Sequence, residues 1–374
     1  MLLSDFASIV LYVVVLSGSA LLMYLGNKTG RRSLIALSLL LPVLLAGVRY
    51  MVGTDYEAYD KLYGLVQTED SRITLSRLTG FEMEPFIIGV SILGGWLSFG
   101  SWFLFGIYAL ITTLFAYFAF RLVDRRYCWV LFGSFLFVVF LGSFNQMRQI
   151  AAIAVLAYLV MRIIKNMTEK KHTKVMSIVL GMAFATMLHY SSIMLAPVLL
   201  VPYIVSKIKH RRTLYLFCCL GIAGLTVLLP RIIDLVVSSG ILPFKQVQAL
   251  VGGNFDGSIL NFGFFAFTTL FAIAVCYFRP KPNDKQDDVY AALLGVGAMY
   301  AALGFYSGYL GRLADLFWMV LLIVIWKVLG KFSDSIRLKI LLMTIFSLLY
   351  FLVVYVVIGA GEVLPYQTIG GGNV

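Results

Sequence analysis

The apolar stretches of this chain are separated by loops, and every second loop is basic. Taking twelve stretches as membrane spans, with the N-terminus outside, places 22 of the 30 Lys and Arg and 6 of the 18 Asp and Glu on one side, a net charge of +16. The other side keeps 8 basic and 12 acidic residues, a net charge of −4. Lys and Arg concentrate in short cytoplasmic loops of membrane proteins. The pattern therefore predicts a multi-pass membrane protein whose N-terminus lies outside the cytoplasm.

The amino-acid composition excludes a soluble globular protein. Hydrophobic residues make up 61% of the 374 residues and charged residues 13%, and the mean hydropathy is +0.93, more apolar surface than a soluble core can bury. The alternation of β-barrel strands is absent, which leaves an α-helical bundle. The loop cations orient the chain and contact anionic lipid head groups, so membrane lipid and no nucleic acid is expected as partner. The four cysteines have no metal-ligand spacing and are expected to pack in apolar surroundings.

A membrane-spanning helix needs roughly 17–25 apolar residues, and the twelve stretches are interpreted as such spans. The expected spans cover residues 6–25, 33–48, 101–121, 128–142, 148–165, 174–189, 191–206, 213–230, 261–278, 289–306, 313–329 and 338–358. Residues 85–98 are apolar but short, and counting them as a span would invert every later loop. We therefore expect an interfacial or re-entrant helix there, within an outer segment over residues 49–100. A second outer segment covers residues 231–260, and residues 1–374 are expected to form a single membrane domain.

Polar residues that could carry chemistry lie at span ends on the outer side. Arg49 ends the second span and precedes the element Gly53-Thr54-Asp55-Tyr56, with Tyr59 following. A charged side chain at the bilayer centre costs about 2.5–3.5 kcal/mol on insertion scales, so Arg49 should face a polar cavity or the interface. A simpler interpretation is a snorkelling arginine followed by a helix cap at Asp55.

Three tight corners on the outer side carry further candidates. Arg148 and Gln149 open the fifth span after a polar hairpin, where the positive end of the helix would reinforce an anion site. His189 joins two spans, and Arg312 is spaced i, i+3 from Asp315 on one helix face. Simpler interpretations are an ordinary hairpin, a histidine bonded to backbone and an internal ion pair. The conjunction of cations, carboxylates and tyrosines at one depth favours a shared water-filled cavity. Such a cavity suits a ligand with an anionic head and an apolar tail, with aromatic faces for sugar rings.

In this setting the chain resembles the EpsG-like group of Wzy-type bacterial polysaccharide polymerases. The resemblance is carried by short, ordered elements along nearly the whole chain. These are Arg49 to Tyr59, Glu84-Pro85, Phe144-Asn145 with Arg148-Gln149, His189 with the serines after it, Arg312, and Pro365-Tyr366. Phe86 after Pro85, where the family places Gly before an aromatic, and the glycine-rich tail depart from that pattern.

The resemblance implies a GT-C-like fold with about twelve transmembrane helices plus the interfacial helix, in the bacterial inner membrane. It implies a glycosyltransferase whose active face is periplasmic. The enzyme would transfer a growing glycan from undecaprenyl diphosphate to the non-reducing end of a second lipid-linked repeat unit. Donor and acceptor are both undecaprenyl-diphosphate-linked oligosaccharides, no cofactor or metal is required, and a chain-length regulator is a further expected partner.

The resemblance also assigns roles, which the residue types fit. Arg148, Arg312 and Arg49 would neutralise the charge that builds on the leaving diphosphate. Asp55, Glu84 and His189 are candidate bases for the acceptor hydroxyl, with Asp55 preferred because it lies in the most specific motif. The catalytic set is therefore Asp55, Glu84, Arg148, His189 and Arg312. The expected substrate-binding residues are Arg49, Tyr56, Tyr59, Asn145, Gln149, Tyr309 and Tyr366.

Other functions of similar membrane proteins remain alternatives. A lipid-linked oligosaccharide flippase would place charges along a central pore, whereas here they gather at one depth. An O-antigen ligase would share the layout but carry one larger periplasmic loop. A secondary transporter would show broken helices at the bilayer midplane, and the spans have few Gly or Pro near their centres.

Overall fold

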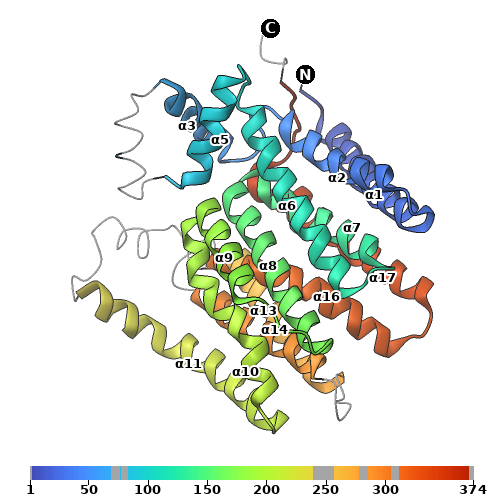
Figure 1. Ribbon diagram of the computed structural model, residues 1–374, viewed down its shortest axis with the longest axis vertical. Coiled ribbons are helices and arrows are strands. Elements are labelled where there is room, and N and C mark those ends of the chain that lie inside the picture. The colour runs from blue at the N-terminus through green and yellow to red at the C-terminus, as the bar shows by residue number, and fades with distance from the viewer. Residues whose placement is uncertain are drawn as a thin grey trace. The chain divides into compact units, whose positions relative to one another are not determined.

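The computed structural model describes residues 2–68, 76, 83–238, 257–277, 285–304 and 311–369 (Figure 1). Within these ranges the chain is helical, with two isolated β-bridges and no strand. The chain divides into two compact units. Unit 1 consists of Met1–Met161, Lys174–Ile193 and Ser335–Val374, and unit 2 of Arg162–Thr173 and Met194–Asp334. The single-domain organisation stays a prediction.

Six helices are long and apolar enough to cross a membrane in the part of the chain that is described. They are Asp5–Thr29, Trp102–Val123, Met147–Thr168, Tyr190–Lys207, Arg312–Phe332 and Ile336–Val357. Shorter apolar helices cover Arg32–Gly47, Pro85–Trp96, Cys128–Val138, Val175–Leu188 and Gly263–Tyr277. Helices satisfy every interior backbone donor and acceptor within the segment, as the apolar phase requires. The prediction of a helical multi-pass membrane protein is confirmed, and each predicted span is helical over most or all of its described residues.

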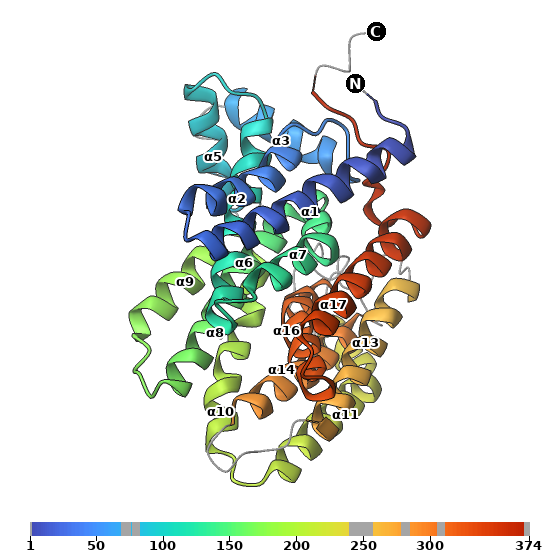
Figure 2. The ribbon, with the colours of Figure 1, turned by 90° about the vertical axis from the view of Figure 1, so that its right-hand side faces the viewer.

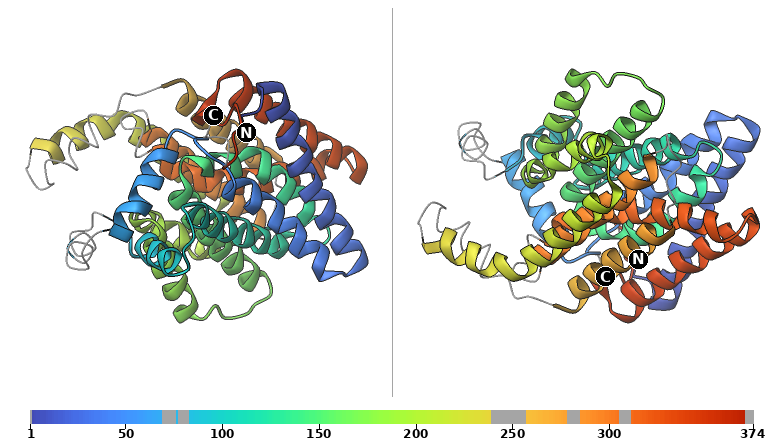
Figure 3. Two further views of the ribbon diagram at one scale, coloured as in Figure 1. Left: turned by 90° about the horizontal axis from the view of Figure 1, so that it is seen from above. Right: turned by 90° about the horizontal axis from the view of Figure 1, so that it is seen from below.

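Unit 1 begins with a tight helical hairpin. Helix α1 (Asp5–Thr29) starts at the N-cap Ser4 and ends at Gly30, whose φ of +72° reverses the chain into α2 (Arg32–Gly47). The two helices lie side by side in every view (Figures 2 and 3). The Ser19 hydroxyl donates to the Ser38 carbonyl across the hairpin at 2.5 Å. This polar contact inside an apolar pair fixes how the helices meet.

The core of unit 1 is built around two buried helices. Nearly all residues of α7 (Cys128–Val138) and the unit 1 part of α8 (Met147–Thr168) are buried. Helix α7 contacts α1, α6 (Trp102–Val123) and α17 (Ile336–Tyr350), which is continued by the π-helical turn η4 (Phe351–Val357) (Figure 2). The remaining unit 1 helices are α3 (Tyr56–Thr68), α5 (Pro85–Trp96), η1 (Phe140–Phe144), α9 (Val175–Leu188) and η5 (Ala360–Glu362).

Unit 2 packs around α14 (Gln286–Leu303), whose residues are mostly buried. Its neighbours are α10 (Val201–Lys207), α11 (Arg211–Ser238), α13 (Gly257–Tyr277), η3 (Arg312–Ala314) and α16 (Asp315–Phe332). The segment η2 (Tyr190–Leu200) precedes α10.

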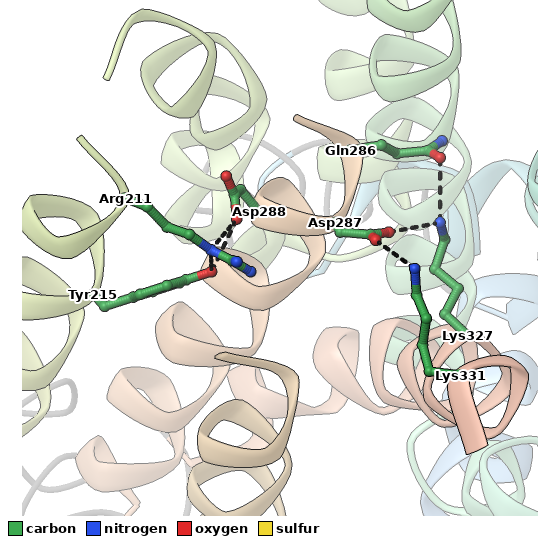
Figure 4. A network of polar contacts seen from close by, with 7 residues as sticks. All are labelled: Arg211, Tyr215, Gln286, Asp287, Asp288, Lys327 and Lys331. Atoms are coloured by element: carbon green, nitrogen blue, oxygen red, sulfur yellow. Dashed lines mark hydrogen bonds and ion pairs between the residues drawn. The ribbon is translucent and has the colours of Figure 1, made fainter. Parts of the chain in front are cut away.

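A polar network binds the first turn of α14 to α11 and α16 (Figure 4). Asp287 pairs with Lys327 at 3.1 Å and with Lys331 at 3.6 Å. Asp288 pairs with Arg211 at 2.7 Å and accepts from the Tyr215 hydroxyl at 2.9 Å. Three of the predicted basic loops therefore meet at one end of unit 2.

Two outer segments differ in detail from the predicted layout. Within residues 85–98, α5 covers Pro85–Trp96, a helix of 12 residues in which Pro85 occupies the first turn, as expected for a missing N–H. Residues 231–238, at the start of the second outer segment, continue α11 to Ser238, so this helix extends beyond the predicted span over residues 213–230. Residues 69–75, 77–82 and 239–256 of the two outer segments lie outside the described residues.

Candidate functional site

A buried carboxylate holds the centre of the candidate site in unit 1. Glu84 immediately precedes α5, Arg148 lies in the first turn of α8, and His189 directly follows α9. Glu84 Oε2 pairs with Arg148 Nη1, and Glu84 Oε1 lies 2.7 Å from His189 Nδ1. The Glu84 side chain is 5% exposed, that of Arg148 25% and that of His189 15%. Three helix ends thus bring together three residues that the sequence singled out separately.

The charge of Glu84 is set by its surroundings. Burial pushes its pKa up, but the hydrogen bond from His189 and the charge of Arg148 outweigh burial and hold the pKa below its ordinary value. Glu84 is therefore ionised at neutral pH. Its Oε2 contacts Arg148, and its Oε1 contacts His189.

Tyrosines enclose this cluster. Arg148 lies over the ring of Tyr59 at 5.3 Å and hydrogen-bonds its hydroxyl. Burial raises the pKa of Tyr59, an effect that Arg148 partly offsets. The Tyr190 hydroxyl donates to the Met83 carbonyl at 3.0 Å, which fixes the backbone beside Glu84. Tyr108, on α6, is fully buried, and its ring packs edge-on against Phe86, two residues after Glu84.

Arg49 lies in a separate aromatic box in unit 1. Its side chain is 1% exposed, and its guanidinium carbon lies 4.4 Å from the ring centre of Phe144 and 4.6 Å from that of Phe105. Tyr56 stacks on Phe105 and forms another wall. Burial lowers the pKa of Arg49 to about 10, which leaves it protonated at neutral pH, and neighbouring tyrosines oppose the shift. The cation is thus held mainly by ring faces, and Tyr59 is a neighbour of both arginines.

The turn after Arg49 is built against the hairpin that precedes α8. Gly53 has a φ of +95°, and a Cβ there would lie 2.7 Å from Asn145 Oδ1 and 2.8 Å from the Phe144 carbonyl oxygen. Asn145 Oδ1 lies 3.2 Å from the Thr54 hydroxyl, and its Nδ2 donates to the Gly361 carbonyl at 2.9 Å. Asn145, predicted to bind substrate, therefore bridges the turn and the C-terminal tail.

The C-terminal tail is pinned by Tyr366, another residue predicted to bind substrate. Its hydroxyl donates to the Leu45 carbonyl at 2.6 Å, its N–H donates to Ser8 Oγ at 2.8 Å, and it is 1% exposed. The tail also pairs with the backbone on either side of Arg49. These contacts indicate that Tyr366 holds the C-terminal tail against α1 and α2.

The remaining predicted residues are Asp55 and Gln149 in unit 1, and Arg312 and Tyr309 in the sequence range of unit 2. Asp55 is half-buried in the turn before α3, where the Thr54 hydroxyl reaches it at 3.4 Å. Gln149 is buried beside Arg148 in the first turn of α8. Arg312 is the first residue of η3 in unit 2, and its positive charge interacts with the carboxyl group of Asp315. Tyr309 lies outside the described residues.

Two tyrosines at the site were missed by sequence reasoning. Tyr190 could have been inferred from its position beside His189. Tyr108 is one of 21 tyrosines in an apolar helix and no motif marks it. No group of three or more His, Cys, Asp and Glu that could hold a metal ion occurs among the described residues.

The fold and the site together define a helical multi-pass membrane protein with a buried Arg–Glu–His cluster at its helix ends. The sequence model of the EpsG family matches residues 32–368, a range that contains every residue of this cluster. The chain belongs to the EpsG family. The comparison with curated proteins and the comparison with solved structures each gave no match.

Proposed function

We propose that the protein is a polysaccharide polymerase that transfers a growing glycan from a lipid diphosphate to a lipid-linked repeat unit. Membership of the EpsG family supports a polymerase of this type. The observation that carries the proposal is the contact of Glu84 with both Arg148 and His189. This cluster combines a base with an anion-binding group, the two functions that glycosyl transfer from a diphosphate needs.

His189 is the proposed general base. Glu84 contacts Nδ1, which leaves Nε2 to take the proton of the acceptor hydroxyl. The acceptor oxygen then bonds to the anomeric carbon of the donor sugar as the bond from that carbon to the diphosphate oxygen breaks, and the electron pair leaves with the diphosphate. Glu84 orients the ring and stabilises the imidazolium that forms, as the carboxylate of a catalytic triad does. Asp55 stays an alternative base.

Arg148 is the proposed anion-binding group. A quarter of its side chain is exposed, so an anionic ligand can reach it. The planar guanidinium of arginine can bind a diphosphate through two parallel hydrogen bonds, which the compact ammonium of a lysine cannot. The ring of Tyr59 beneath the guanidinium supports it by a cation–π contact. The predicted role of Arg312 in the same reaction is tested by its own substitution.

The proposed topology has twelve spans in a GT-C-like arrangement, with the N-terminus and the site on the periplasmic face of the bacterial inner membrane. The charge pattern of the loops supports this orientation. The meeting of basic residues of three loops at one end of unit 2 agrees with it. Undecaprenyl is the proposed lipid, and a chain-length regulator is a proposed partner.

The test is an assay of purified protein with synthetic lipid-linked repeat units, read as a product ladder. A polymerase gives a ladder of repeats, a ligase adds glycan only to a different acceptor, and a flippase leaves the substrate unchanged. We expect a ladder from the wild type, and none from Arg148→Ala, His189→Ala or Arg312→Ala. Arg32→Ala, at the start of α2, is the matched control and should keep it. Normal ladders from Arg148→Ala and His189→Ala would contradict the proposed site.

A further inference from the structure

The ion pair between Glu84 and Arg148 raises a question about how the site accepts an anion. In the structure Arg148 Nη1 is bound to Glu84 and the Tyr59 hydroxyl is also hydrogen-bonded to Arg148. Arg148 Nε is buried without a hydrogen-bond partner. A diphosphate that turns the guanidinium toward itself, in the reaction of the proposed function, would weaken the contact of Arg148 with Glu84.

Loss of the Arg148 contact would leave the Glu84 carboxylate buried without its charged partner, at a large cost in free energy. Its side chain is only 5% exposed, so water cannot replace the lost partner. His189 contacts only one of the two carboxylate oxygens. A buried carboxylate that loses a charged partner is strongly destabilising unless another donor takes over. Binding of the anion is therefore favourable only if a second donor stands next to Oε2.

Tyr108 is the candidate for that donor, because its ring packs against Phe86 and its hydroxyl is free to donate. It is 0% exposed, and its hydroxyl is buried without a hydrogen-bond partner. The ionisable groups close enough to act on this hydroxyl are Glu84, Arg148 and Tyr59. Its ring is held edge-on by Phe86, two residues after Glu84, at 5.4 Å. A buried hydroxyl normally has a hydrogen-bond partner. The unpartnered hydroxyl of Tyr108 therefore points to a second state of the site in which it has one.

We propose that Tyr108 is a positioning residue that donates its hydroxyl hydrogen to Glu84 when Arg148 engages the diphosphate. In the unliganded protein Glu84 is held by Arg148 and His189. In the liganded protein it is held by Tyr108 and His189, so that the histidine stays oriented while the arginine serves the ligand. Tyr108 needs no access to solvent for this role.

The experiment measures binding of farnesyl diphosphate and of farnesol to purified protein in detergent. Tyr108→Phe keeps the ring and removes only the hydroxyl. Tyr117→Phe is the matched control, because Tyr117 lies on the same helix, is buried, and has its hydroxyl occupied by Arg121. We expect Tyr108→Phe to bind farnesyl diphosphate about tenfold more weakly, the value of one hydrogen bond to a charged group. Binding of farnesol, and both affinities of Tyr117→Phe, should stay at wild-type values.

A double-mutant cycle separates positioning from packing. A neutral amide at position 84 needs no replacement donor, so Tyr108→Phe should change affinity by less than about twofold in the Glu84→Gln background. Equal losses in both backgrounds, or no loss in either, would overturn the inference while leaving the proposed function intact. A marked drop in the melting temperature of unliganded Tyr108→Phe would also overturn it, because the hydroxyl would then have a partner in that state. Failure of the wild type to prefer farnesyl diphosphate over farnesol would refute the proposed function itself, and this inference with it.

Discussion

Replacing Glu84 by Gln tests the site at its centre. The amide keeps the shape of the carboxylate but removes the charge that holds Arg148 and stabilises a protonated His189. Removing one partner of a fully buried ion pair costs about 3–5 kcal/mol of stability. Since Arg148 is 25% exposed and the amide can still hydrogen-bond, we expect a loss of about 2 kcal/mol, less than the buried limit.

The expected effect on the reaction is larger than the effect on folding. A histidine base whose orienting carboxylate becomes an amide falls in rate by about 10⁴-fold in comparable triads. The rate of ladder formation, corrected for the folded fraction found by size-exclusion chromatography, gives the value for Glu84→Gln. Glu57→Gln is the matched control, because Glu57 lies on the exposed face of α3 and pairs with Lys61, and its rate should not change. A Glu84→Gln rate within about threefold of the wild type would refute the reasoning.

Three further predictions follow from the described contacts. Arg148→Lys keeps the charge but loses the planar fork over Tyr59, so kcat/KM should fall about 100-fold, measured by initial rates; an unchanged value would exclude bidentate binding. Gly53→Ala forces a Cβ against the Phe144 carbonyl at a positive φ and should lower stability by about 1–3 kcal/mol, measured by denaturant unfolding, with Gly64→Ala, where nothing lies within 4 Å, as control. The lowered pKa of Glu84 contributes stability that is present above the ordinary carboxyl pKa of about 4.3 and is lost as pH falls through the folded value. The stability advantage of the wild type over Glu84→Gln should therefore begin to shrink as pH falls below about 4.3, and parallel pH profiles would contradict the shift.

The helices were largely predictable from the sequence, and the reason is physical. Apolar runs bounded by charges must be helical in a bilayer, so runs such as residues 6–25 and 338–358 match α1 and the α17–η4 segment closely. The end of α11 was misplaced because the apolar pattern changes gradually there, without a strong stop signal. The division of the chain into two units depends on which helices pack together, which hydropathy does not encode.

The candidate site was predictable as a set of residues but not as a set of contacts. Arg148, Glu84 and His189 stood out because charged or polar residues at apolar span ends need a reason. Glu84, rather than Asp55 or Arg49, lies between Arg148 and His189. This arrangement depends on how α5, α8 and α9 come together in the fold. Asn145 and Tyr366 stood out for the same reason, yet their polar atoms hold the turn at Gly53 and the C-terminal tail. Short motifs thus mark residues with a constrained polar environment, and only the fold separates those that hold the chain from those with capacity left for a ligand.

That distinction can be made from hydrogen-bonding capacity. The polar atoms of Asn145 and the Tyr366 hydroxyl are occupied within the protein, so a ligand could bind them only by breaking native contacts. Arg148 retains a buried unpaired Nε and a partly exposed guanidinium, and Tyr108 retains an unpaired hydroxyl. Because buried polar groups without partners cost free energy in the unliganded protein, their concentration around Glu84 is a stability cost that binding would relieve. Arg49 also keeps unpaired nitrogens, but aromatic faces already surround its charge. Substrate contacts should therefore be sought first at Arg148 and His189, and Tyr108 should be tested as a residue that positions Glu84.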